Sequence, residues 1–300
     1  PSSFFYKMLR KKNILLNGKR AKGNEKLQEG DVIRLYLSEE TIEKFRKMIA
    51  PEKKGKPEKL AIVYEDENVI FLNKPQGLLS QKSKIQDRSL TEALADYLNG
   101  KETEEAEVMF RPGLCNRLDR NTSGMVLAGK NVASVQQLSS MIADRKMGKY
   151  YLTLVKGEIR NSRKIRGFLV KDEKTNQVFV SDTLITDGVP IETCYEPLSV
   201  GKGVTLLKVE LITGKSHQIR AHLSSIGHPI IGDPKYGDAE LNDRFRRKYH
   251  LRYQLLHSWQ TVFPEMDGVL SYLSGKSFTA PVPKLFMDII RSEKLTGDEL

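Results

Sequence analysis

The chain has few of the residues that build disulfide frameworks, metal clusters and membrane spans. Its two cysteines in 300 residues, Cys115 and Cys194, show no spacing typical of a metal site or a disulfide framework. No apolar run approaches the roughly 18 residues of a membrane-spanning helix, and even VTLLKVEL is interrupted by Lys208. These absences argue against a disulfide-stabilised domain and a membrane protein. We expect a cytoplasmic monomer.

Acidic residues are missing from the amino-terminal end of the chain. Residues 1–22 contain seven Lys and Arg and no Asp or Glu, and residues 1–57 carry a net charge of +8 out of +11 for the whole chain. A positive field concentrated at one end indicates a polyanionic partner. The alternative is a solvated basic arm that serves solubility. The residues expected to contact nucleic acid are Lys7, Arg10, Lys11, Lys12, Lys19, Arg20 and Lys22.

The pattern of the first 38 residues predicts a small module. FFYKML has apolar residues at helical spacing, ILLNG predicts a strand that ends in an Asn-Gly turn, and GDVIRLYL predicts a turn and a second strand. This order of helix, basic tip, NG and GD resembles the alpha-L RNA-binding module that is shared with an S-four-like ribosomal protein. The module's preceding helix is absent. We therefore interpret residues 1–38 as a partial alpha-L domain, residues 39–59 as a charged linker and residues 60–300 as a second, larger domain.

Strand and helix patterns interleave irregularly from residue 60 onward. The segment 60–75 predicts two strands around an acidic turn, and 87–100 and 131–147 predict amphipathic helices, the first with a capping box of Ser89 and Glu92. Further strands are predicted at KYYLTLVKGEI, QVFVSDTLI and VTLLKVELIT. Hairpin-like pairs with few βαβ units favour an α+β domain with a mixed, largely antiparallel sheet.

One carboxylate lies between two arginines in RLDRNTSG, residues 117–124. The segment precedes the apolar strand pattern MVLAGK, so Asp119 is expected in a loop. Asp119 could simply begin the turn that runs to Gly124, as aspartates often do. The alternative is a catalytic carboxylate that neighbouring arginines keep ionised. Local sequence alone does not decide between the two.

Histidines and glycines gather between residues 211 and 237. GKS lacks the earlier glycine of a phosphate-binding loop, because position 209 is Val209. His217, His222 and His228 with Asp233 would make a poor metal site, since the first two histidines are five residues apart. We predict no metal here. The pattern favours a strand end, a turn and the helix SHQIRAHLSSIG, with Arg220 near the turn as a partner of a phosphate or a carboxylate.

Two further segments are candidates for ligand contacts. VIFLNKPQG predicts a strand that runs into a rigid turn whose backbone is open to a ligand. Tyr150 and Tyr151 begin the strand KYYLTLVKG, so one side chain must face inward and the other outward. An aromatic ring in a cleft can stack on a base, although a core tyrosine is the commoner outcome.

Taken in order, NKPQGLLS, NRLDRNTSG, KYYLTLVKG and TGKSHQIRAHLSSIGHPIIGDPKYG resemble the successive motifs of the RluA-type pseudouridine synthases. LLHSWQTVF and FTAPVPKLFMDII resemble that family's closing segments. The resemblance implies that residues 60–300 form a pseudouridine synthase catalytic domain, which isomerises uridine in RNA without a cofactor. Ribosomal RNA, chiefly of the large subunit, is the expected partner, and transfer RNA is the alternative.

The resemblance also implies roles for individual residues. Asp119 would be the essential catalytic carboxylate, Tyr151 would stack on the base and handle protons, and Arg220 would pair with Asp119 to keep it ionised. Asn116 stands where the family often has His. The residues expected to bind the substrate are Arg117, Asn73, Lys74, Gly77 and His217.

The chemistry of uridine isomerisation needs a charged carboxylate near the sugar. The N1–C1′ bond must break and the base must rejoin through C5, so Asp119 would either attack C1′ or remove a proton from C2′. The base must also leave its stack to be reached. Two other classes remain open: a non-catalytic RNA-binding or ribosome-assembly factor, and a metal-dependent hydrolase built on the histidine-rich segment.

Overall fold

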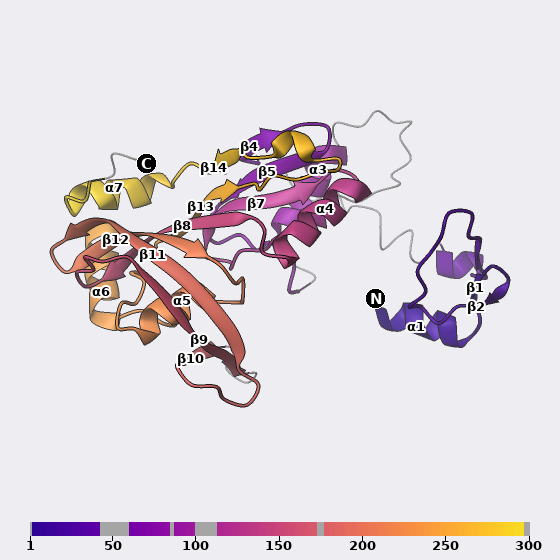
Figure 1. Ribbon diagram of the computed structural model, residues 1–300, viewed down its shortest axis with the longest axis horizontal. Coiled ribbons are helices and arrows are strands. Elements are labelled where there is room, and N and C mark those ends of the chain that lie inside the picture. The colour runs from indigo at the N-terminus through magenta and orange to yellow at the C-terminus, as the bar shows by residue number, and fades with distance from the viewer. Residues whose placement is uncertain (1, 43–59, 85–86, 100–112, 173–176, 297–300) are drawn as a thin grey trace. The chain divides into compact units, whose positions relative to one another are not determined.

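The computed structural model describes residues 2–42, 60–84, 87–99, 113–172 and 177–296 (Figure 1). Contacts between residues divide the chain into two units, Pro1–Lys56 and Pro57–Leu300. The boundary lies within the predicted linker, and most of that linker, residues 43–59, is outside the described residues. The acidic segment KETEEAE, for which the sequence predicts a surface loop, is outside them as well.

The amino-terminal unit is a helix on a three-stranded sheet. α1 (Ser2–Arg10) is followed by β1 (Ile14–Leu16), β2 (Lys19–Arg20) and β3 (Ile33–Leu35), in the order β2-β1-β3. Met8 and Leu9 of α1 are buried against Ile14, which gives this unit its own small core. The turn falls at Asn17-Gly18, where both φ angles are positive, at 49° and 75°. The predicted helix, strands and Asn-Gly turn are confirmed.

The first residues of the predicted linker form a helical turn. Residues 39–42 are helical, and Ser38 caps this turn, because its Oγ accepts a hydrogen bond from Thr41 N–H at 3.3 Å. A serine before a run of charged residues is a common helix start. The interpretation of residues 39–59 as a charged linker stays a prediction.

The larger unit is built on one long sheet with strand order β10-β9-β11-β12-β8-β13-β7-β5-β4. β14 pairs with β13 and β6 pairs with β7. In the described residues the ladder between β13 and β7 is parallel and the other named ladders are antiparallel. The α+β class with a mixed, largely antiparallel sheet is confirmed. The strands are β4 (Ile62–Glu65), β5 (Val69–Lys74), β6 (Gly113–Leu114), β7 (Ser123–Gly129), β8 (Gly148–Lys156), β9 (Arg163–Asp172), β10 (Gln177–Ser181), β11 (Val189–Gly201), β12 (Val204–Leu211), β13 (Leu256–Val262) and β14 (Ser277–Thr279).

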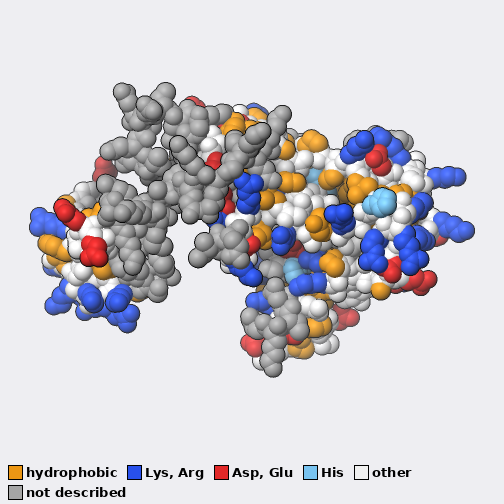
Figure 2. Space-filling model, turned by 180° about the vertical axis from the view of Figure 1, so that it is seen from behind, with side chains coloured by type: hydrophobic (Ala, Val, Ile, Leu, Met, Phe, Trp, Pro, Cys, Tyr) orange, Lys and Arg blue, Asp and Glu red, His pale blue; other side chains and the backbone are white. Residues whose placement is uncertain are grey.

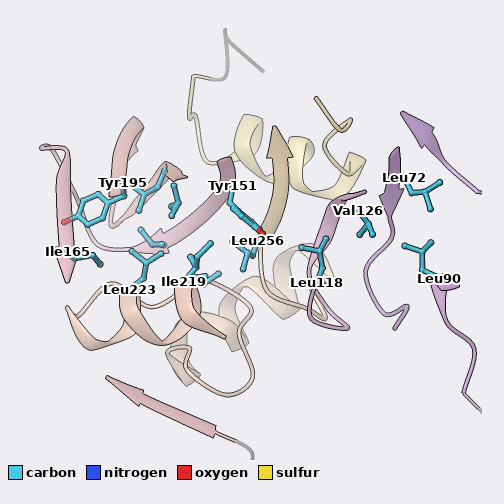
Figure 3. Packing of buried hydrophobic residues seen from close by; sticks show 14 of the residues in the cluster. Leu72, Leu90, Leu118, Val126, Tyr151, Ile165, Tyr195, Ile219, Leu223 and Leu256 are labelled. Carbon is cyan, nitrogen blue, oxygen red and sulfur yellow. The ribbon is translucent and has the colours of Figure 1, made fainter. Parts of the chain in front are cut away.

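Helices pack on this sheet and define where its core lies. The helical segments are α3 (Leu90–Asn99), α4 (Val132–Ala143), α5 (Gln218–Ser225), α6 (Ala239–Tyr249), the 3-10 turn η1 (Ser271–Leu273) and α7 (Lys284–Ser292). Figure 3 shows the main core as a continuous row of side chains, with Leu118, Tyr151 and Leu256 at its middle. Ile219 of α5 belongs to the same cluster. No described helix has the length and apolar character that a membrane span requires.

The start of α3 differs from its predicted capping box. Ser89 Oγ is buried without a hydrogen-bond partner, and Glu92 forms an ion pair with Lys82. Backbone carbonyls replace the predicted side-chain caps: Leu90 N–H donates to Leu79 O at 2.8 Å, and Thr91 N–H donates to Ser80 O. Because an adjacent segment already satisfies these first N–H groups, the helix does not need the capping box.

The seam between β7 and β13 is tightly packed. Gly124 has φ of +112°, and a Cβ at this position would overlap the backbone of Ser258. One residue earlier, Ser123 Oγ lies 2.9 Å from His257 Nδ1, and His257 Nε2 lies 3.1 Å from Ala280 O. The TSG sequence that follows Asp119 therefore fits a strand that approaches its neighbour closely.

Candidate active site

Asp119 lies in the loop that leads into β7, and a second loop holds that segment in place. Thr122 N–H donates to Asp119 O at 3.0 Å, which closes the turn. On the far side, Ser80 Oγ donates to Leu118 O and accepts from Leu118 N–H, at 3.0 and 3.1 Å. The backbone before and after the carboxylate is thus fixed, while the side chain of Asp119 stays 28% exposed.

Lys74 supports this loop from inside the protein. Its side chain is fully buried, and Nζ donates to the carbonyls of Pro75, Leu78 and Arg120 at 2.9, 2.8 and 3.1 Å. Burial lowers the pKa of Lys74 to about 7, and the nearby carboxylate of Asp119 opposes that shift. Substrate contact by Lys74 stays a prediction, because the contacts that the structure gives this side chain anchor the Asp119 loop.

The neighbours of Lys74 in NKPQG also bind the protein itself. Gly77, with φ of +85°, donates its N–H to Arg120 O at 2.9 Å and accepts from Arg120 Nε at 3.0 Å. Asn73 Nδ2 donates to Pro281 O at 2.8 Å. Substrate contact by Asn73 and Gly77 therefore stays a prediction, because the contacts that the structure gives them are internal. Arg120, beside Asp119 in sequence, braces the loop.

The partner of the Asp119 carboxylate comes from a distant segment. Arg220, near the start of α5, donates from Nη1 to Asp119 Oδ2 at 2.8 Å. Its Nε and Nη2 donate to the two oxygens of Asp233 at 2.7 and 2.9 Å. Within the described residues, Asp119 Oδ1 has no hydrogen bond or ion pair. One oxygen of the carboxylate is anchored and the other is left for a ligand.

Two carboxylates hold a cation in a site that is nearly closed to water. The side chain of Arg220 is 6% exposed and that of Asp233 is 0% exposed. Burial disfavours the charge on Arg220, but hydrogen bonds and attraction from Asp233, and then from Asp119, outweigh it and raise the pKa of Arg220. The guanidinium also lies over the Tyr236 ring, 5.1 Å from its centroid. Arg220 is therefore a fixed charge.

His217 lies beside the ion pair, at the residue that precedes α5. It adopts the left-handed conformation with φ of 56°, and its Nε2 lies 3.8 Å from Asp119 Oδ2. Its Nδ1 lies 2.8 Å from the Tyr236 hydroxyl. Burial, opposed by Asp119 and reinforced by Arg220, lowers the pKa of His217, which favours the neutral ring.

Tyr151 lies on β8, near enough for the charge of Asp119 to act on its hydroxyl. Alternation along the strand buries Tyr151 to 7% exposure, while Lys208 Nζ lies over the ring of the adjacent Tyr150. Burial raises the pKa of Tyr151 to about 12, a hydrogen bond with Ser258 opposes the shift, and Asp119 adds to it. The hydroxyl therefore stays protonated at neutral pH.

The remaining predicted residues lie on the surface or have internal partners. Arg117 is exposed, and so are the seven basic residues predicted in the amino-terminal unit. Figure 2 shows Lys and Arg side chains gathered on this unit. His222 Nδ1 lies 3.0 Å from Thr193 Oγ1, and His228 Nδ1 lies 2.9 Å from Lys156 O. In the part of the chain that the structure describes, no group of three His, Cys, Asp or Glu could hold a metal ion.

Sequence reasoning missed Asp233 and Tyr236 as parts of this site. Asp233 entered only as a possible metal ligand, and Tyr236 did not enter at all. The available signal was GDPKYG, which follows the Arg220 helix closely and places a carboxylate and an aromatic ring within one turn. Asp233 O accepts from Gly237 N–H, and its Oδ1 accepts from Lys235 and Tyr236 N–H, so the turn is built around this residue.

Comparisons with known proteins agree on one family. A family model described as RNA pseudouridylate synthase matches residues 68–225. The ribosomal large subunit pseudouridine synthase C of Vibrio vulnificus is 34% identical over 86% of this chain and 78% of its own length. The ribosomal large subunit pseudouridine synthase D of Borreliella burgdorferi is 32% identical over 80% of this chain and 70% of its own. The solved structure of human RNA pseudouridylate synthase domain containing 4 shares the fold, with a TM-score of 0.64 and 22% identity, and covers 79% of this chain and 94% of that one.

Proposed function

The chain belongs to the RNA pseudouridylate synthase family, and we propose that it converts specific uridines of large-subunit ribosomal RNA to pseudouridine with Asp119 as the essential carboxylate and without a cofactor. Membership makes it an isomerase that acts on RNA. The choice of ribosomal RNA rests on the names of relatives such as the Vibrio vulnificus and Borreliella burgdorferi enzymes.

The single observation that carries the assignment of Asp119 is the asymmetry of its carboxylate. Arg220 binds Oδ2 at 2.8 Å, while Oδ1 has no partner among the described residues in a side chain that is 28% exposed. A nucleophile or base needs one oxygen free and its charge stabilised by a fixed partner. Asp233 is bound to the same guanidinium but is fully buried, so it serves as the support rather than the reactant.

The reaction leaves the composition of the uridine unchanged. The N1–C1′ bond breaks, the uracil turns, a C5–C1′ bond forms, the proton on C5 is removed and N1 gains one. Asp119 Oδ1 either adds to C1′ as the base departs or takes a proton from C2′. Arg220 stabilises the carboxylate in either case through Oδ2. Tyr151, protonated and next to Asp119, supplies a ring for the turned base and a hydroxyl near its edge.

The amino-terminal unit suits an RNA anchor. Its seven predicted contact residues are exposed on a folded helix and sheet. Exposed lysines and arginines bind phosphates and release counterions, so this unit would contribute affinity that depends on salt. Selection of the uridine would remain with the larger unit, where the base must be flipped out of its stack to reach Asp119.

Release of tritium from RNA labelled at uridine C5 tests the proposal. We expect release with the wild-type protein in the presence of a strong chelator, and none with Asp119→Asn, although this variant binds the RNA with similar affinity. The matched control is Asp288→Asn, since Asp288 is half exposed in α7 and pairs only loosely with Arg291 at 3.9 Å. Release by Asp119→Asn would remove this residue from the mechanism. Tritium release from transfer RNA but not from ribosomal RNA would identify transfer RNA as the substrate.

A further inference from the structure

A gap of defined size separates His217 from the anchored oxygen of Asp119. His217 Nε2 lies 3.8 Å from Asp119 Oδ2, which is too long for a hydrogen bond. Both side chains keep some exposure, 16% for His217 and 28% for Asp119. The two atoms are too close for another atom to lie between them, so a bound group would contact both from their exposed side, and the two polar atoms set which chemical groups fit there.

Tyr236 fixes which nitrogen of His217 carries the proton. Val178 N–H donates to the Tyr236 hydroxyl oxygen at 3.0 Å, and that hydroxyl lies 2.8 Å from His217 Nδ1. If Nδ1 accepts a hydrogen bond from the hydroxyl, each donor among these three groups has an acceptor, and Nε2 carries the hydrogen of the ring. A proton on Nδ1 would instead leave the hydroxyl proton unused and turn the lone pair of Nε2 toward the Asp119 carboxylate. The Nε2–H form is the favoured one.

The gap thus lies between a donor and an acceptor. His217 presents an N–H, and Asp119 Oδ2 presents a carboxylate oxygen. A substrate atom that contacts both must accept one hydrogen bond and donate another. A hydroxyl does so, whereas a carbonyl oxygen only accepts and would be repelled by the carboxylate. A hydroxyl oxygen about 2.8 Å from each atom would stand beside the line that joins them, because two such hydrogen bonds placed end to end are longer than the separation of 3.8 Å.

The ribose of the target nucleotide carries such a hydroxyl in the right place. The 2′-hydroxyl of a nucleoside lies on the face of the sugar opposite the base, and this is also the face from which a carboxylate reaches C1′ during departure of the base. An Asp119 whose Oδ1 addresses C1′ therefore has Oδ2 next to O2′. Both oxygens of one carboxylate can be used at once.

We propose that His217, held by Tyr236, binds the 2′-hydroxyl of the target uridine together with Asp119 Oδ2 and thereby selects RNA over DNA at the reacting nucleotide. This inference rests on the proposed function, since it places the ribose at Asp119. The 2′-hydroxyl is the group by which proteins distinguish the two nucleic acids. His217 is then a specificity-determining residue.

A double-mutant cycle between protein and RNA tests the proposal. Wild-type protein and His217→Asn are each assayed on an RNA with uridine or 2′-deoxyuridine at the target position, mapped first with the wild-type protein. Asn tolerates the left-handed conformation at this position, and its shorter side chain does not reach the gap. Losing one hydrogen bond lowers kcat/KM about tenfold. We expect His217→Asn alone to have this effect, the 2′-deoxy change alone to have at least this effect because it also removes the contact with Asp119 Oδ2, and both together to be no worse than the 2′-deoxy change alone.

Losses that multiply, to about a hundredfold for the doubly altered pair, would overturn the inference. Tyr236→Phe is the second variant, and it should lower the preference for uridine over 2′-deoxyuridine without abolishing turnover. If the deoxy substrate reacts too slowly to measure, the Kd values of the two RNAs decide. Wild-type protein should prefer the ribo form and His217→Asn should not, and an unchanged preference would refute the contact. A wild-type protein that makes no pseudouridine would instead refute the proposed function.

Discussion

Arg220 reaches across 101 residues of chain to bind Asp119 Oδ2 at 2.8 Å. The same guanidinium donates to Asp233 from its two other nitrogens. One buried cation is therefore bound by two carboxylates, of which Asp119 is the more exposed. In the proposed function the partly exposed carboxylate reacts, and the buried one orients the cation. This division of labour makes the two aspartates separable by experiment.

Asp233→Asn should lower both stability and turnover. The change removes the charge that balances Arg220 inside the protein, and breaking a buried ion pair costs about 3 to 5 kcal/mol of unfolding free energy. Asp119→Asn should cost less, because Asp119 is partly exposed. Urea unfolding of both variants, with tritium release measured in parallel, checks this order. An Asp233→Asn protein as stable and active as the wild type would contradict the account of the site.

Tyr151→Phe and Tyr151→Leu should separate the ring of Tyr151 from its hydroxyl. The ring lies in the core cluster beside the carboxylate, so Phe preserves packing and the stacking surface, while Leu removes the aromatic face. We expect Tyr151→Phe to bind RNA normally and to lose turnover, and Tyr151→Leu to lose both. Single-turnover rates and Kd values provide the measurement. Full activity of Tyr151→Phe would exclude proton transfer by this hydroxyl.

His257 should make the stability of the larger unit depend on pH in a defined window. Burial lowers the pKa of His257 to about 4, against the ordinary value of 6.5, and its contact with Ala280 O opposes the shift only in part. Because the unfolded chain binds a proton at higher pH than the folded one, stability is lost as pH falls from about 6.5 to about 4. The integrated effect is about 3 kcal/mol.

The replacement His257→Gln checks this contribution. The variant lacks the titrating ring, so its unfolding free energy should fall less steeply than that of the wild type between pH 7 and pH 4. Urea unfolding at intervals of half a pH unit gives both curves. Parallel curves would mean that His257 does not gain its proton on unfolding in this range.

Neutralising Lys11, Lys12 and Arg20 together should weaken RNA binding at every sequence and flatten its salt dependence. All three are exposed in the amino-terminal unit, and each phosphate contact that is lost reduces the slope of log K against log salt by about 0.7 to 0.9. Titrations at several salt concentrations measure the slope. Neutralising Lys276, Lys284 and Arg291 in the larger unit is the control. Equal slopes for both triple variants would remove the amino-terminal unit as the anchor.

The order of the motifs predicted the outline of the site, because sequence neighbours fix local geometry. RLDRNTSG lies in a loop before a strand, and SHQIRAHLSSIG begins with a turn and forms a helix that carries Arg220 near its start. The contact between Arg220 and Asp119 followed from a resemblance, and the structure brings the two side chains together. Their catalytic roles stay predictions.

The sequence did not reveal the features of the site that depend on contacts between distant segments. Lys74 has the residue type of a surface or ligand contact, and only the folded chain supplies three carbonyls that make its burial tolerable. The two arginines that flank Asp119 in sequence do not form its ion pair in the described residues: Arg120 donates to Gly77 O instead, and Arg117 is exposed. Strands β9 and β11, with mixed residue patterns, were not predicted at all.

β13 lies inside the sheet but comes late in the sequence, and this affects when the parts of the site can assemble during synthesis. In the sheet, β13 lies between β8, which carries Tyr151, and β7, which follows Asp119. Because the chain is synthesised from its amino terminus, Asp119, Tyr151 and Arg220 emerge from the ribosome before residues 256–262. At that point β7 and β8 lack the strand that lies between them in the finished sheet. We expect the nascent polypeptide to stay catalytically inactive until synthesis is almost complete.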